Sequence, residues 1–151
     1  MKLSYKTNAW QKLSWNEHCD LAEKMELDGL ELCYSPAEST DLISDLQHKQ
    51  QFLRRLSEKQ LEIACVSVDV KGDEDTLDTA LRNAADCIEL ARVLRTPYVC
   101  LDMDFECDKD EARLITLIGV LMPKAKTEGI TLLIETKGVC LPSGCTVRVK
   151  F

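Results

Sequence analysis

The sequence lacks the features that identify several common classes of protein. Aromatic residues make up only 5% of its 151 residues, and no segment approaches the roughly 18 uninterrupted apolar residues that a membrane helix needs. The first residues, MKLSYKTNAWQKLSWNE, contain no apolar stretch of the kind found in secretory signals. We therefore expect a cytoplasmic protein with no membrane partner.

Positive charge is also scarce. Nineteen Lys and Arg stand against 26 Asp and Glu, which gives a formal net charge of -7. Such a chain repels nucleic-acid phosphates, so a nucleic-acid partner is not expected. With 45% hydrophobic and 30% charged residues, the composition is typical of one soluble globular domain with a sizeable core.

Familiar catalytic and metal motifs are missing as well. The sequence contains no GxGxxG, GxxxxGK[ST], GxSxG or HExxH, and none of its eight cysteines forms a CxxC pair. Cys140 and Cys145 form a CxxxxC with no second pair, which is a poor zinc site, so most cysteines are expected to be reduced and structural. The two histidines, His18 and His48, are expected on solvated helix faces.

Five short runs, most of them rich in Ile, Leu, Val and Cys, alternate with amphipathic segments of helical period. Most of the runs lack clean alternation, which is typical of strands covered on both faces. The predicted strands are Lys2–Thr7, Leu30–Tyr34, Leu61–Val70, Pro97–Met103 and Ile130–Glu135. The predicted helices lie around Leu21–Met25, Leu42–Leu56, Leu77–Ala91 and Asp110–Glu128.

Helix boundaries have their own signals. Ser14 and Glu17 have the spacing of a capping box, and Gly29 and Gly129 are predicted to end helices in the left-handed conformation. Pro123 predicts a kink or a break in the last helix.

The resulting order, βαβαβαβαβ, predicts an α/β fold with a parallel sheet and right-handed crossovers. Two architectures fit this order. One is an open, doubly wound sheet of the flavodoxin type, which the chain length favours, and which would make the protein a noncatalytic module for a small ligand or a protein. The other is a (β/α)₈ TIM barrel that ends after about the fifth strand, with its helices on the outer face.

In both architectures ligands bind at the carboxyl ends of the strands, and those ends are polar here. Glu135 is notable because it lies inside an apolar strand, where a carboxylate is costly unless it is paired or bound to a metal. Glu31 has the same character. The polar residues in and after the five strands are Asn8, Glu31, Tyr34, Asp69, Lys71, Asp102, Asp104, Glu135 and Lys137.

Several segments, in order and spacing, resemble the N-terminal half of the xylose isomerase-like TIM-barrel superfamily, the sugar phosphate isomerase/epimerase group. The segments that carry the resemblance are Thr7-Asn8-Ala9-Trp10, Asp28-Gly29-Leu30-Glu31-Leu32, Thr96-Pro97-Tyr98-Val99 after the helix Ala84–Leu94, and Glu128-Gly129-Ile130 leading to Leu133-Ile134-Glu135-Thr136. The resemblance implies a partial barrel over residues 1–138.

The resemblance further implies a metal-dependent isomerase or epimerase that moves a proton between adjacent carbons of a small-molecule sugar. Glu135 would bind a divalent metal, Mn²⁺, Mg²⁺ or similar, and act in proton transfer. Asn8, Glu31, Asp69 and Asp102 would bind the substrate. Family members often carry histidine after the third and fourth strands, where this chain has aspartate, so hydrolysis of abasic DNA by a zinc cluster is disfavoured.

The end of the sequence departs from the family. The remaining metal ligands of the family come from the sixth to eighth strands, and residues 139–151 lack the amphipathic helix expected after the fifth strand. This tail has the composition of an out-of-frame or disordered segment. We therefore expect the isolated chain to be inactive, and to form homo-oligomers through free strand edges and an uncovered apolar interior face.

Overall fold

A computed structural model of the chain describes residues 1–10, 12–70, 77–103 and 111–136. It contains one parallel sheet of five strands in the order β1-β2-β3-β4-β5. The strands are β1 (Ser4–Lys6), β2 (Gly29–Cys33), β3 (Glu62–Val70), β4 (Tyr98–Met103) and β5 (Thr131–Thr136). The predicted five strands are therefore confirmed, with small shifts at their ends.

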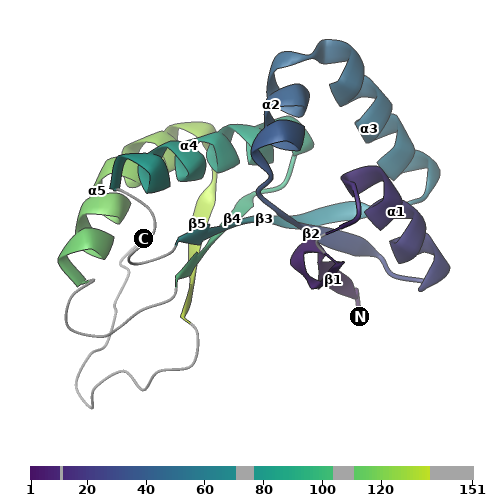
Figure 1. Cartoon of the computed structure of the whole chain (residues 1–151), viewed down its shortest axis with the longest axis horizontal. Helices are drawn as coiled ribbons and strands as arrows, with labels where there is room; N and C mark the ends of the chain where they lie inside the picture. Colours follow the sequence, from purple (N-terminus) through teal and green to yellow (C-terminus); the bar gives the residue numbers. More distant parts are fainter. Residues whose placement is uncertain (11, 71–76, 104–110, 137–151) are drawn as a thin grey trace.

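The strand order decides between the two architectures. In a doubly wound sheet the strand order reverses, as in the 2-1-3-4-5 order of flavodoxin, and helices cover both faces. Here each strand pairs with the next one in sequence, so right-handed crossovers place the helices on one side of a curved sheet (Figure 1). The prediction of a partial TIM barrel is confirmed, and the open-sheet alternative is wrong.

The helices largely follow the predicted pattern. They are α1 (Trp15–Lys24), α2 (Pro36–Ser44), α3 (Leu46–Glu58), α4 (Leu77–Leu94) and α5 (Glu111–Glu128), with a 3-10 turn, η1, at Thr7–Trp10. The capping box of Ser14 and Glu17 is confirmed. The helix predicted over Leu42–Leu56 is two helices, because the Asp45 carboxylate accepts hydrogen bonds from the backbone N–H groups of Gln47 and His48 and starts α3.

Pro123 lies inside α5 and does not break it, since the helix continues through this residue to Glu128. No helix of the described residues is both long enough and apolar enough to cross a membrane.

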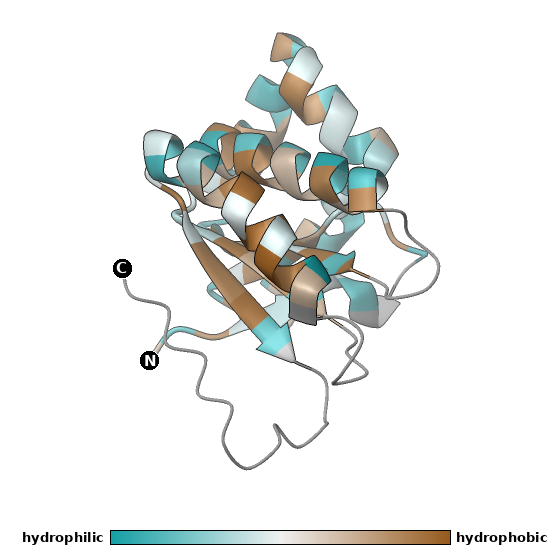
Figure 2. Ribbon diagram, turned by 90° about the vertical axis from the view of Figure 1, so that its left-hand side faces the viewer, coloured by the Kyte–Doolittle hydropathy of each residue, from teal (hydrophilic) through white to brown (hydrophobic). Residues whose placement is uncertain are grey.

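The two faces of the sheet differ in chemistry. Alternate residues of β2, β3 and β4 pack in the core with α4 and α5, and those strand residues are Leu30, Leu32, Val66, Val68, Val70, Val99, Leu101 and Met103. The intervening residues are charged or small, and the charged ones include Glu31 and Asp102. Along β5, Figure 2 shows a change of another kind, because this strand is apolar for most of its length and polar at its carboxyl end.

This alternation corrects the expectation of an uncovered apolar interior. The side of β2 to β4 opposite the helices carries carboxylates, hydroxyls and thiols, because cysteines that look like core residues in the sequence alternate with the true core positions. Leu133 of β5, 40% exposed, is an exception. Among the described strands, β1 and β5 each keep one edge without a strand neighbour, so association through these edges stays a prediction.

Gly129 and Gly29 play different roles. Gly129 has φ 69°, which confirms the predicted left-handed helix end. Gly29 lies inside β2 and has no such conformation, so its prediction as a helix end is wrong; Glu26, with φ 55°, adopts that conformation instead. Gly29 is required by close packing, since a Cβ atom there would lie 2.4 Å from the Glu62 carbonyl oxygen.

His18 also departs from expectation. Its side chain is buried, not solvated, and its Nδ1 lies 2.7 Å from the Tyr5 hydroxyl. Burial lowers the pKa of the His18 imidazole. This contact joins β1 to α1. The five described cysteines are free, as expected: Cys19, Cys33, Cys65, Cys87 and Cys100.

The close approach at Gly29 predicts a measurable loss of stability. Gly29→Ala should lower the free energy of unfolding by about 1 to 3 kcal/mol, because the new methyl group would meet backbone that cannot move aside. Gly119→Ala is the matched control, since nothing lies within 4 Å of its Cβ position and alanine favours a helix by roughly 0.5 to 1 kcal/mol. Urea unfolding measures both; equal effects would contradict the assignment.

Burial of His18 predicts sensitivity to acid. The folded-state pKa is lowered, so the unfolded chain binds a proton more readily, and the stability is lost as pH falls through about 6.5. His18→Gln should flatten the decline in unfolding free energy between about pH 7 and pH 5.5. His48→Gln, at an exposed position, is the control and should leave the decline in place. An unchanged pH profile for His18→Gln would contradict this account.

Candidate functional site

One lysine lies among three carboxylates on the face of the sheet opposite the helices, which we call the open face. The Lys6 Nζ atom is 2.8 Å from Asp102 Oδ2, 3.3 Å from Glu31 Oε1 and 3.4 Å from Glu135 Oε2. The four side chains come from β1, β2, β4 and β5. We call them the Lys6 cluster. It is the densest group of charges inside the described sheet, so it is the candidate site.

The stagger of a barrel sheet explains why these residues meet. Lys6 pairs in register with Glu31, and Glu31 pairs with Cys65 of β3. Asp69, four residues beyond Cys65, pairs with Asp102, which in turn pairs with Glu135. Because barrel strands tilt by about 36° from the axis, residues later in the later strands reach the same level as Lys6.

Exposure differs sharply within the cluster. The Asp102 side chain is 1% exposed and that of Lys6 is 21% exposed, whereas Glu135 is 54% exposed. Burial on its own would lower the pKa of the Lys6 ammonium, but the hydrogen bond to Asp102 and the charge of Glu31 outweigh burial and hold that pKa above its ordinary value. Lys6 is therefore a permanent cation, and Glu135 is the carboxylate most accessible to a ligand.

Thiols form the floor beside the charges. Burial raises the pKa of Cys65 to about 12 and that of Cys100 to about 11, so both thiols stay neutral at physiological pH. Cys100 Sγ lies 4.0 Å from Glu135 Oε2, and Cys33 Sγ lies 3.3 Å from Ser67 Oγ. These groups serve as small packing residues rather than as nucleophiles.

The structure brings together three of the residues that the sequence singled out, namely Glu31, Asp102 and Glu135. Asp69 is exposed and lies in the same register row as Asp102. Asn8 lies in η1, partly exposed, beside Thr7, whose hydroxyl accepts a hydrogen bond from the Cys33 backbone N–H at 2.9 Å.

Other predicted residues lie elsewhere. The Tyr34 hydroxyl donates to Asp86 of α4 at 3.0 Å, and burial, with this hydrogen bond, raises the pKa of Tyr34 to about 12. Tyr34 therefore ties β2 to the helix layer. The predicted residues Lys71, Asp104 and Lys137, and the tail 139–151, lie outside the described residues.

Lys6 is the residue that the sequence analysis missed. Its signal in the sequence is the same as that of Glu135, a charged side chain within a predicted strand.

The Lys6 cluster does not fit a divalent metal. Within the described part of the chain, no group of three or more His, Cys, Asp or Glu side chains is placed to hold an ion. The reason is visible in the geometry, because the Lys6 ammonium lies between the carboxylates that such an ion would need. The metal-binding role expected for Glu135 stays a prediction.

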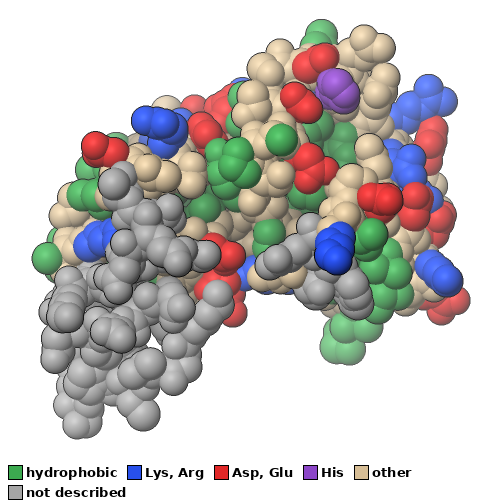
Figure 3. Space-filling model, viewed as in Figure 1, with side chains coloured by type: hydrophobic (Ala, Val, Ile, Leu, Met, Phe, Trp, Pro, Cys, Tyr) green, Lys and Arg blue, Asp and Glu red, His purple; other side chains and the backbone are tan. Residues whose placement is uncertain are grey.

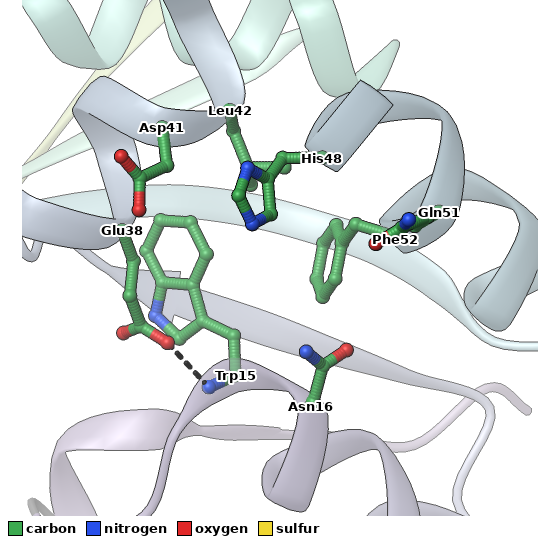
Figure 4. A pocket seen from close by; sticks show the side chains of 8 residues that line it. All are labelled: Trp15, Asn16, Glu38, Asp41, Leu42, His48, Gln51 and Phe52. Atoms are coloured by element: carbon green, nitrogen blue, oxygen red, sulfur yellow. Dashed lines mark hydrogen bonds between the residues drawn. The ribbon is translucent and has the colours of Figure 1, made fainter. Parts of the chain in front are cut away.

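Away from the Lys6 cluster, a hollow of about 190 Å³ lies between α1, α2 and α3 (Figure 4). Acidic side chains gather near the visible histidine on this side of the molecule (Figure 3). The rings of Trp15 and Phe52 lie 6.0 Å apart at its wall, and Glu38 Oε1 accepts a hydrogen bond from the Trp15 backbone N–H at 2.7 Å. Burial raises the pKa of Glu38. These groups hold three helices together, so the Lys6 cluster remains the candidate site.

Comparisons with known proteins agree with the barrel fold. No protein-family model matches the sequence, and no curated protein matches it. Among solved structures, the chain is similar to the probable 3-DHS dehydratase AsbF of Bacillus anthracis, with a TM-score of 0.67 and 16% identity over 89% of this chain and 52% of that one.

Two further solved structures are similar to the chain. A xylose isomerase domain protein of Planctomyces limnophilus gives a TM-score of 0.64 and 14% identity over 91% of this chain and 54% of that one. The IolI protein, described with a bound zinc atom, gives a TM-score of 0.68 and 14% identity over 90% of this chain and 51% of that one. The chain thus spans about half the length of these structures, and it has the fold of the N-terminal half of xylose isomerase-like barrels.

The buried ion pair predicts that Lys6 and Lys2 contribute differently to the free energy of unfolding. Lys6→Met should lower the free energy of unfolding by about 3 kcal/mol, because it leaves the buried Asp102 carboxylate without its ammonium. Lys2→Met, which removes an exposed pair with Glu62 at 2.6 Å, should change the free energy of unfolding far less, because water screens that pair.

Urea unfolding of both variants measures the difference. Adding Asp102→Asn to Lys6→Met should recover part of the loss, since it removes the buried charge. Equal losses for the Lys6 and Lys2 variants would show that the Lys6 cluster contributes nothing beyond a surface ion pair.

Proposed function

We propose that the chain supplies the N-terminal half of the active site of a sugar or sugar-phosphate isomerase/epimerase. The observation that carries this proposal is the Lys6 cluster itself. It lies on the face of the sheet opposite the helices, toward the carboxyl ends of β4 and β5, which is where barrel enzymes bind their substrates. The similarity to a xylose isomerase domain protein supports the same class.

Glu135 is the proposed base. Its carboxylate is half exposed and is the member of the Lys6 cluster with the longest contact to the ammonium, at 3.4 Å. A carboxylate that a substrate can reach takes the proton from the carbon beside a carbonyl and returns it to the neighbouring carbon. Transfer between adjacent carbons is the reaction of an isomerase, and return to the opposite face of the same carbon is that of an epimerase.

The remaining carboxylates are proposed to bind the substrate. Sugar hydroxyl groups donate hydrogen bonds, and Glu31 and Asp69 present acceptor oxygens on one face of the sheet. Asp102, whose side chain is 1% exposed, would act on the substrate through the Lys6 ammonium that it holds. Asn8, at the end of β1, adds an amide that both donates and accepts. The proposed partner is therefore a small-molecule sugar.

Other parts of the proposal concern a complete barrel. A divalent metal, Mn²⁺ or Mg²⁺, would need ligands from a longer chain. The isolated 151-residue chain is expected to be inactive, because about half of each similar structure has no counterpart in it. A cytoplasmic location and a homo-oligomer remain predictions.

Ketose binding tests the proposal. In ¹⁵N-labelled protein, D-xylulose and D-fructose 6-phosphate are added separately, and the backbone resonances of the Lys6 cluster should shift while that of Glu62, at the amino end of β3, should not. Glu31→Gln should weaken binding, whereas Glu62→Gln is the matched control. Shifts confined to other surfaces, or none with either sugar, would contradict the proposal.

The role of Glu135 is tested in a version that carries a complete barrel. Exchange of the substrate C–H for deuterium in D₂O should fall at least about 100-fold in Glu135→Gln, because the amide cannot accept the proton. Substantial exchange by the Gln variant would remove Glu135 from the mechanism.

A further inference from the structure

The Lys6 ammonium occupies the centre of a cage of three carboxylates. Glu31, Asp102 and Glu135 each direct one oxygen toward Nζ, at distances of 3.3, 2.8 and 3.4 Å. Carboxylate oxygens at this density are the ligands that Mg²⁺, Mn²⁺ and Ca²⁺ prefer. The oxygens are therefore of the kind that a divalent ion prefers, but as the described residues stand they form no site for one, and the Lys6 ammonium lies among them.

Position and burial keep the ammonium there. Lys6 ends β1, so its backbone is fixed by the pairing with Glu31 of β2. Its strongest partner, Asp102, is 1% exposed, and a buried carboxylate is costly without a cation. Moving the ammonium away would leave that charge behind. A divalent ion would have to displace Lys6 or approach it against the repulsion of like charges.

We propose that Lys6 is the resident cation of this site: its ammonium takes the place of a divalent ion and stabilises the negative oxygen of the reacting sugar. The second half of this statement rests on the proposed function, whereas the occupancy of the cage does not. The site would then belong to an isomerase whose electrophile is an ammonium group, acting on a polyhydroxy ketone or aldehyde.

The chemical step balances without a further reactant. The C–H bond beside the carbonyl breaks, its proton goes to Glu135, and its electron pair becomes the new C=C bond while the carbonyl oxygen gains negative charge beside Lys6. A hydroxyl proton passes between the two neighbouring oxygens, and Glu135 returns its proton to the adjacent carbon. Lys6 stays protonated throughout, because its carboxylate neighbours favour the charged form, so it does not form a Schiff base with the carbonyl.

The inference makes a specific prediction about metal binding. The full chain is titrated with Mn²⁺ alone, and free Mn²⁺ is followed by electron paramagnetic resonance. Wild type and Lys2→Met should bind weakly and equally, whereas Lys6→Met, which frees the three-carboxylate cage, should bind at least about tenfold more tightly. Lys6→Met/Asp102→Asn should lose this gain.

A second measurement covers the case in which Lys6→Met folds poorly. In wild type, Mn²⁺ should not broaden the NMR resonances of Asp102 and Glu135 more than that of the exposed Glu62. Lys6→Gln, which keeps a polar side chain, should show selective broadening at the cage.

Two results would overturn the proposal. One is selective broadening of Asp102 and Glu135 in wild type, because it would show a divalent ion in the cage beside Lys6. The other is equal Mn²⁺ affinity in wild type and in a folded Lys6 variant. Since neither readout uses a sugar, a failure of ketose binding counts against the proposed function and leaves the occupancy of the cage to be decided by Mn²⁺.

Discussion

A carboxylate buried on the open face of the sheet is the constraint on which the candidate site depends. Asp102 is almost inaccessible to water, and a charge in that position needs a cation close to it. The cation comes from the edge strand β1, where Lys6 is the last residue. The pair therefore links the first strand to the fourth across the open face, and it draws Glu31 and Glu135 to the same ammonium.

The division of the sheet into two chemical faces follows from strand geometry. Side chains alternate along a strand, so one set packs under α4 and α5 while the other set is left to the open face. The helix side is aliphatic, and the open side of β2 to β4 combines carboxylates with hydroxyls and neutral thiols. An interior face of this composition does not require a covering layer as an aliphatic face would.

Much of the fold could be predicted from the sequence, because strand-length apolar runs and helical periodicity are local signals. The choice between barrel and open sheet could not be made from length, since half of a barrel and a small doubly wound domain have similar sizes. The resemblance to xylose isomerase-like proteins pointed to the barrel, and the strand order bears it out. Burial of His18 depends on Tyr5, and the need for Gly29 depends on Glu62; both are contacts between distant segments that no local pattern contains. The carboxylates of the site can be recognised in the sequence as charges inside strands. Their cation, Lys6, cannot be assigned to them in the same way, because the strand tilt that brings Lys6 to Asp102 is a property of the sheet as a whole.

The central claim, that Lys6 is a protected cation held by three carboxylates, can be measured directly. The side-chain ¹H–¹⁵N NMR spectrum of lysine ammonium groups at pH 7 detects those whose protons exchange slowly with water. Slowly exchanging signals are expected in wild type and in Lys2→Met from Lys6 and from Lys59, whose ammonium pairs with Asp20 and Glu23. The Lys6 signal should be absent from Lys6→Met, and the Lys59 signal should remain. A wild-type spectrum without a protected ammonium, or the same set of protected signals in wild type and in Lys6→Met, would contradict the account.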